Sequence, residues 1–128
     1  MSPTKPQLAI LADLAGDDYG LWEMTGKLST GLQVDYERDR PMAEDELRTS
    51  AHQALIGLLE DAWVQFYVTD EPHGERPQVL RKERALSLMD ENAPWVAPMF
   101  REEGPYVHLE MTSDGRERWF TPGAIDDP

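Results

Sequence analysis

The sequence of 128 residues suits one domain with a single hydrophobic core, and its lack of cysteine excludes disulfides and thiolate metal sites. No apolar run approaches the roughly 18 residues of a membrane-spanning helix, and the N-terminus lacks the features of a signal peptide, so we expect a cytoplasmic protein without membrane contact. A formal net charge of −13 repels phosphate backbones and anionic surfaces.

The acidic residues are unevenly distributed along the chain. Residues 1–75 contain fifteen acids and five bases, whereas residues 76–128 contain ten acids and seven bases. The two parts therefore carry net charges of −10 and −3. Such a field steers basic partners toward the protein, although an excess of acids also serves solubility alone.

The first forty residues predict two helices and a short strand. Thr4 suits the N-cap of a helix that ends at Gly16, with Pro6 in its first turn. The apolar residues at helical spacing in it are Leu8, Leu11, Ala12 and Ala15. A second helix is predicted within residues 19–30, with one face made of Leu21, Met24, Thr25 and Leu28. The alternation of Leu32, Val34 and Tyr36 predicts the strand.

The third predicted helix, residues 41–62, has the clearest pattern. One apolar stripe follows helical spacing along it: Leu47, Ala51, Ala54, Leu55, Leu58, Leu59 and Ala62. Pro41 and the acids that follow it are typical of a helix start, where acids oppose the positive end of the helix dipole. Gly57 costs such a helix about 1 kcal/mol relative to alanine, which indicates a close contact with another helix.

Two strands with matching patterns follow, separated by 36 residues. In residues 63–69 the inward set is Val64, Phe66 and Val68, and in residues 106–111 it is Val107, Leu109 and Met111. Antiparallel pairing of the two runs buries both sets on one face of a sheet. His108 falls in the outward set, so we expect it on the surface.

The residues between these strands, 70–105, are called the insertion below. They predict a loop, a short amphipathic helix around "VLRKERALSLMDEN" and a proline-punctuated turn in which Trp95 and Phe100 hold the segment to the domain. After the second strand, Thr112 suits the N-cap of a last short helix. Residues 121–128 are expected to be a frayed tail.

The segments "ALIGLLEDAWVQFYV" and "YVHLEMTSDGRERWF" resemble the winged helix-turn-helix family, in which the third helix runs into the first wing strand and a second strand returns beside it. The resemblance implies an α+β fold for residues 1–128: three N-terminal helices and a small antiparallel sheet, here with a helical insertion between the wing strands. It also implies DNA reading by the third helix in the major groove.

The residues of the third helix disfavour that DNA-binding function. The exposed side chains suited to base readout are Arg48, Thr49, His52 and Gln53. Residues 41–62 contain five acids and Arg48 as their one base, whereas phosphate contacts need flanking lysine and arginine. Duplex DNA is therefore the alternative partner, and a transcriptional regulator is the alternative function.

The favoured hypothesis is a protein-interaction module that binds a basic protein, in the manner of an inhibitor, immunity protein or antitoxin. Aromatic and basic residues dominate interface hot spots, and the insertion concentrates both. The predicted partner-binding residues are Arg81, Lys82, Arg84, Trp95, Phe100 and Arg101. No catalytic, cofactor or metal motif is present in the sequence, so we expect neither an enzyme nor a cofactor. The oligomeric state is left open.

Overall fold

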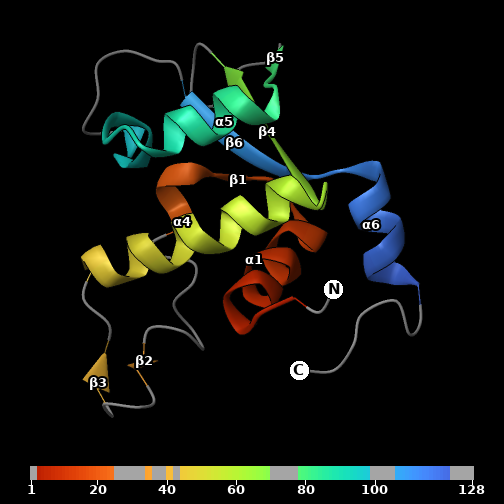
Figure 1. Cartoon of the computed structure of the whole chain (residues 1–128), viewed down its shortest axis with the longest axis horizontal. Helices are drawn as coiled ribbons and strands as arrows, with labels where there is room; N and C mark the ends of the chain where they lie inside the picture. The colour runs from red at the N-terminus through yellow and green to blue at the C-terminus, as the bar shows by residue number, and fades with distance from the viewer. Residues whose placement is uncertain are drawn as a thin grey trace.

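The computed structural model describes residues 3–24, 34–35, 40–41, 44–69, 78–98 and 106–121. In these residues four α-helices accompany a four-stranded antiparallel sheet of order β1-β6-β4-β5, so the predicted α+β class is confirmed (Figure 1). A separate two-stranded ladder joins β2 (Val34–Asp35) to β3 (Arg40–Pro41). The described residues contain no helix that is both long and apolar enough to cross a membrane.

Helix α1 (Lys5–Gly16) begins and ends where the sequence predicts. Thr4 caps it, with the Gln7 backbone N–H donating to Thr4 Oγ1 over 3.3 Å and the Thr4 backbone N–H donating to Gln7 Oε1 over 2.9 Å. The predicted apolar face was partly wrong, because Ala12 is exposed and Leu8 is half-buried. The buried set is Gln7, Ile10, Leu11 and Leu14.

The helix predicted within residues 19–30 is wrong at its start. Tyr19 and Gly20 form strand β1 (Tyr19–Gly20), which pairs with β6, and the 3₁₀-helix η1 (Leu21–Glu23) follows. A Cβ on Gly20 would lie 2.4 Å from the ring of Trp22, so only glycine lets the chain turn that tightly beneath the indole. The remainder of the predicted helix, with Thr25 and Leu28, lies outside the described residues.

Strand β2 lies within the strand predicted from Leu32, Val34 and Tyr36, of which Leu32 and Tyr36 lie outside the described residues; its pairing with β3 was not predicted. Val34 lies opposite Pro41, and Asp35 lies opposite Arg40. Pro41 was expected in the first turn of the third helix, and this was wrong, because it ends β3. The helix begins three residues later, at Glu44.

Helix α4 (Glu44–Glu60) buries the predicted stripe from Leu47 to Leu59 against α1 and the sheet. Gly57 marks the close helix contact that the sequence indicates: a Cβ there would lie 2.4 Å from Gln7 Nε2, which donates to the Ala54 carbonyl oxygen over 3.3 Å. Ala62 was wrongly placed in the stripe. It is exposed and has a φ of 58°, because the chain reverses there before entering β4.

The predicted antiparallel pairing of β4 (Val64–Thr69) with β6 (Tyr106–Met111) is confirmed. The register places Val64 opposite Met111, Phe66 opposite Leu109 and Val68 opposite Val107, so the two inward sets share one face. That face is covered by α1, α4 and α5, whose buried residues join it in one hydrophobic core.

The insertion contributes structure that the sequence only partly predicts. Strand β5 (Gln78–Val79) pairs with β4 at the edge of the sheet and was not expected. Helix α5 (Lys82–Met89) is the predicted amphipathic helix, and it packs Ala85, Leu88 and Met89 into the core. The 3₁₀-helix η2 (Ala93–Trp95) follows it.

Helix α6 (Ser113–Phe120) closes the far end of the molecule and has the predicted cap, with the Gly115 backbone N–H donating to Thr112 Oγ1 over 2.8 Å. Its arginines reach the C-terminal ends of two other helices. Arg116 donates to the Ala15 carbonyl oxygen at 3.3 Å, and Arg118 donates to that of Asp61 at 3.1 Å while its guanidinium lies 3.7 Å from the centre of the Trp63 ring. The predicted tail beyond Thr121 lies outside the described residues.

Candidate partner-binding surface

The four residues predicted to read DNA lie on α4, but they do not form one free surface. Arg48 and His52 point toward the turn that follows α5. Arg48 donates from Nη1 to Asn92 Oδ1 at 2.6 Å and from Nη2 to the Glu91 carbonyl oxygen at 3.1 Å. His52 Nε2 lies 3.6 Å from Asp90 Oδ1. Two of the four side chains therefore hold the insertion in place.

Trp95 completes this junction between α4 and the insertion. Its side chain is 7% exposed, and its Nε1 donates to the Met89 carbonyl oxygen over 3.0 Å. The Arg48 guanidinium lies 5.1 Å from the centre of the indole, and the His52 ring lies 6.2 Å from it. The sequence predicted two roles for Trp95, a clamp that holds the insertion to the domain and a contact with a partner. The contacts of the indole agree with the clamp, and the partner contact stays a prediction.

The insertion is a permanent part of the domain because it shares the core. Ala85 and Met89 are fully buried, and Leu88 is nearly so. Burial of a leucine or methionine side chain contributes roughly 1.5–3 kcal/mol each, and a marginally stable domain loses its fold when several such contributions are removed. The packing of α5 in the core therefore places residues 90–92 beside Arg48 and His52.

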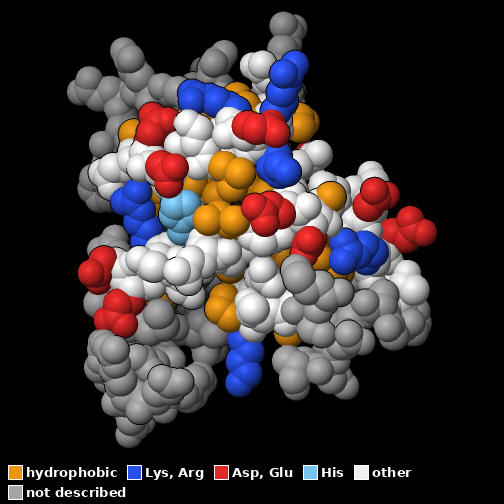
Figure 2. All heavy atoms as spheres, in the orientation of Figure 1, with side chains coloured by type: hydrophobic (Ala, Val, Ile, Leu, Met, Phe, Trp, Pro, Cys, Tyr) orange, Lys and Arg blue, Asp and Glu red, His pale blue; other side chains and the backbone are white. Residues whose placement is uncertain are grey.

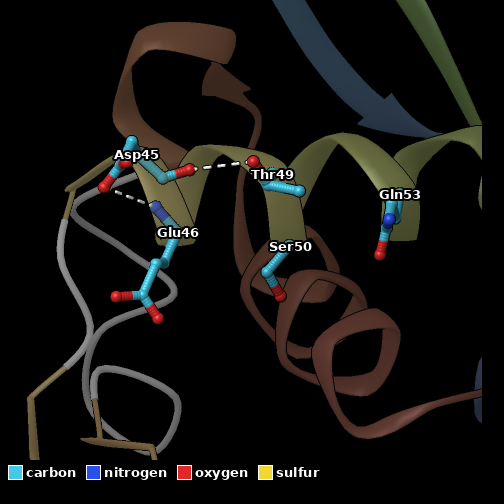
Figure 3. A pocket seen from close by; sticks show the side chains of 5 residues that line it. All are labelled: Asp45, Glu46, Thr49, Ser50 and Gln53. Atoms are coloured by element: carbon cyan, nitrogen blue, oxygen red, sulfur yellow. Dashed lines mark hydrogen bonds between the residues drawn. The ribbon is translucent and has the colours of Figure 1, made fainter.

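The other two predicted DNA readers, Thr49 and Gln53, lie on a separate, exposed side of α4 (Figure 3). They line an open depression of about 340 Å³ together with Asp45, Glu46 and Ser50. Thr49 Oγ1 is bonded to the Asp45 carbonyl oxygen at 2.9 Å, and Asp45 Oδ1 accepts the Glu46 backbone N–H at 3.0 Å. The depression thus offers carboxylates, which repel phosphate, beside polar groups already bonded within the helix.

An apolar seam lies between α4 and α5. Figure 2 shows hydrophobic side chains gathered between the two helices, with charged side chains around them. The partly buried apolar residues that α4 and α5 contribute are Ile56 and Leu86. The sequence analysis missed both residues. They could have been found, because each is a large apolar residue outside the stripe that its helix buries.

The basic residues predicted to bind a partner lie on α5 and just before it. Arg81, Lys82 and Arg84 are all exposed, and Arg84 Nη1 lies 3.9 Å from Glu91 Oε2. The structure therefore leaves these three exposed at the start of α5. Phe100 and Arg101, the other two predicted partner contacts, lie outside the described residues.

A second cluster of polar and aromatic residues covers the outer face of the sheet. It contains His108, whose predicted position was wrong. It is 9% exposed, although a surface position was expected. Tyr67 stacks on the His108 ring with centroids 4.9 Å apart, Trp22 meets it edge-on at 5.2 Å, and Thr69 Oγ1 lies 2.9 Å from its Nε2. The alternation of the strand indicated the correct face, but the aromatic cover comes from β4 and η1.

Tyr67 links this cluster to the turn after α1. Its hydroxyl donates to Asp18 Oδ2 at 3.0 Å. Burial raises the pKa of the Tyr67 phenol well above its ordinary value, and the hydrogen bond to the Asp18 carboxylate raises it further. Beside it, Gln65 Nε2 donates to Glu110 Oε1 at 2.6 Å. The polar groups of this cluster form hydrogen bonds with one another, as expected for a cluster with a structural role.

The described residues contain no group of three or more histidine and carboxylate side chains placed to hold a metal ion. Comparison of the chain with protein-family models, with curated proteins and with solved structures finds no match in any of the three. The surface of the molecule is therefore the guide to its function, and the junction of α4 with the insertion is the candidate region.

Proposed function

We propose that the chain is a protein-interaction module on a winged-helix-like scaffold and that it binds a basic protein partner in place of DNA. The scaffold part of the proposal is supported by the order of the elements. Helix α4 leads within a few residues into β4, and β6 returns beside β4 before a capped helix. The third helix and wing strands of the resembled family follow this order, with α5 and η2 inserted between the strands.

The main observation behind the proposal is that Arg48 and His52 already contact residues of the insertion. In a winged-helix DNA reader these positions on the third helix would face base edges. Here Arg48 has hydrogen bonds to residues 91 and 92, and His52 lies beside Asp90. A major groove cannot approach that side of α4 while α5 and η2 cover it.

Charge supports a basic partner. Helix α4 contains Glu44, Asp45, Glu46 and Glu60 against the single base Arg48, which is already engaged. The negative field of the whole chain speeds the approach of basic proteins and slows that of nucleic acids. Neutralisation of a basic toxin or nuclease, or masking of a surface that binds nucleic acid, is the class of role that these properties suit.

Titration with a fluorescent DNA duplex tests the exclusion of DNA. We expect anisotropy to stay flat up to tens of micromolar protein at about 50 mM salt. The reason is that α4 has too few lysine and arginine side chains to neutralise DNA phosphates. Sub-micromolar binding that weakens tenfold or more at about 200 mM salt would contradict the proposal. Arg48→Ala serves as the control, since a reading arginine would be needed for that binding.

Crosslinking in the native host, followed by mass spectrometry, tests the partner. We expect captured proteins of high isoelectric point, and we expect capture to fall when Asp45 and Glu46 are replaced by lysine. The matched control replaces Asp114 and Glu117 on α6 by lysine, which makes the same change in net charge at another surface. Equal losses for both pairs would show that only the total charge matters and would remove α4 from the interface.

A further inference from the structure

The outer face of the sheet carries one row of residues that crosses all four strands. The register places both Gly20 and Tyr67 opposite His108, one on each side of it. Val79 lies opposite Tyr67 on the edge strand β5. Because directly opposed residues of antiparallel strands share a face, the row ends beside the Tyr67 ring at Val79, which is 54% exposed.

Three carboxylates lie near the Tyr67 ring on this face. Asp18 Oδ2 accepts a hydrogen bond from the Tyr67 hydroxyl at 3.0 Å, and Asp17 precedes Asp18 in the exposed turn after α1. Glu110 lies on β6 and is half-buried. Burial raises the pKa of the Tyr67 phenol most, and the charges of all three carboxylates raise it further. The three charges therefore act on one ring.

The hydrogen bonds of these carboxylates leave their charges in place, because every donor is neutral. Asp17 Oδ1 accepts the Asp18 backbone N–H at 2.8 Å, and Glu110 Oε1 accepts Gln65 Nε2 at 2.6 Å. In the described part of the chain, no lysine or arginine forms an ion pair with any of the three. The β1–β6 register, continued by one residue, brings Asp18 opposite Glu110. Like charges opposed in this way are destabilising, and a cation between them would relieve the repulsion.

We propose that this part of the outer face binds an arginine side chain of a protein partner. The guanidinium would lie between the Asp18 and Glu110 carboxylates. The aliphatic part of the arginine would pack on the Tyr67 ring and on Val79. These four residues are called the arginine site below.

Arginine suits the site better than lysine does. A planar guanidinium stacks on an aromatic ring and donates to two carboxylates at once, whereas an ammonium is a compact and strongly hydrated charge. The hydrogen bonds from Tyr67 and Gln65 already hold the two carboxylates in place. Binding therefore costs less conformational entropy than it would with free side chains.

The arginine site is separate from the acids of α4. Helices α1, α4 and α5 pack in the core on the inner face of the sheet, whereas the site lies on the outer face. The inference therefore goes beyond the proposed function, because it gives the module a second surface. Its test does not depend on Asp45 or Glu46.

The closing experiment titrates the whole protein with three short peptides and follows the backbone amide chemical shifts. The peptides have blocked ends and differ in one residue between glycines, which is arginine, lysine or citrulline. Citrulline has the shape of arginine without its charge. We expect the arginine peptide to shift the amides of Gln65, Tyr67 and Glu110. It should bind at least fivefold more tightly than the citrulline peptide and at least twofold more tightly than the lysine peptide. Equal affinity of the arginine peptide and either of the others would overturn the inference.

A charge-neutral double variant locates the bound arginine. Asp18→Asn with Glu110→Gln removes both charges but keeps an oxygen to accept each hydrogen bond, so we expect a folded protein that binds the arginine peptide at least fivefold more weakly. The matched control is Asp114→Asn with Glu117→Gln on α6, which makes the same change in net charge and should alter affinity less than twofold. Equal losses for the two pairs would show a general attraction to acids and would overturn the inference. Circular-dichroism melts establish folding, and Asp17→Asn, which should weaken binding about twofold, replaces the double variant if that fails to fold.

The outcomes separate this inference from the proposed function. Shifts confined to α4 would overturn the arginine site and would leave an interaction module in place. Tight DNA binding in the titration above would remove the proposed function, whereas the peptide titration would still decide whether the outer face binds arginine.

Discussion

At the scale of single residues, several side chains owe their roles to neighbours that are distant in the sequence. Gln7 caps its own helix and also bonds to the Ala54 carbonyl oxygen of α4. It fills the space that a Cβ on Gly57 would need. Gly57 thus costs helix propensity in α4, and it permits a buried hydrogen bond between two helices.

A double-mutant cycle at this contact should show strong coupling. Gly57→Ala gains about 1 kcal/mol of helix propensity, but in the natural chain it displaces the Gln7 amide and loses hydrogen bonds that contribute roughly 1 kcal/mol each. We expect Gly57→Ala to be less favourable, by about 1–2 kcal/mol, in the natural chain than in the Gln7→Ala background. Urea unfolding of the four proteins measures this difference, and additive effects would contradict the packing described.

Tyr67 should make stability depend on pH in the alkaline range. Its folded pKa is raised by burial and by Asp18, whereas the phenol of the unfolded chain ionises near pH 10. The folded state therefore holds the proton more tightly than the unfolded state does. The contribution of Tyr67 to the free energy of unfolding is thus complete below about pH 10 and is lost as the pH rises above that value.

Urea unfolding at about pH 8 and about pH 11 tests this dependence. We expect the free energy of unfolding to fall between the two values, and to fall less in Tyr67→Phe, which has no ionisable phenol. Tyr19→Phe is the control for general alkaline effects. The same slope in Tyr67→Phe and in the natural chain would show that Tyr67 does not carry the dependence.

At the scale of elements, the β4–β6 ladder joins the core to the candidate surface. Its inner face packs on α1, α4 and α5, and the insertion leaves from the end of β4 and returns to the start of β6. The position of the seam therefore depends on this pairing, because the pairing sets where α5 meets α4.

Val64→Asp should unfold the domain. Val64 is 2% exposed and lies opposite Met111, so the variant buries an unpaired carboxylate, which costs more than about 4 kcal/mol. The matched control is Val79→Asp, because Val79 is 54% exposed on the edge strand β5. Cooperative melts should survive in the control alone, and a melt of Val64→Asp near that of the natural chain would refute the packing.

At the scale of the whole molecule, the insertion stabilises the domain as well as shaping its surface. Trp95, Leu88 and Met89 lie in the same core as α1 and α4. A wing that only connected two strands would be dispensable to folding. The insertion is not dispensable in this way, because its side chains form part of the hydrophobic core. The insertion and the rest of the domain are therefore one unit.

Replacement of residues 73–103 by an Asn-Gly hairpin turn should abolish the cooperative melt. The turn suits a two-residue hairpin, but the change removes buried side chains from the core and leaves Arg48 without its partners at residues 91 and 92. Circular-dichroism melts and binding of a hydrophobic dye measure the loss. A stable, dye-free hairpin variant would show that the insertion is an independent appendage.

The sequence by itself determined those elements whose evidence lies within a few residues. The stripe from Leu47 to Leu59 predicts α4, the alternation around Phe66 and Leu109 predicts the paired strands, and the threonines at 4 and 112 predict helix starts. Each of these patterns follows from backbone periodicity and local hydrogen bonds. The exposed bases Arg81, Lys82 and Arg84 of the candidate surface were predictable for the same reason.

Only the tertiary structure decided which side chains are free to act. Trp95 and His108 are buried because α4, β4 and η1 cover them, and Arg48 is engaged because residue 92 arrives beside it from 44 positions away. Tyr19 and Gly20 form a strand because β6 offers them hydrogen bonds, which outweigh the helical pattern of their neighbours. Burial and pairing of this kind depend on contacts between distant segments, and no local pattern records those contacts.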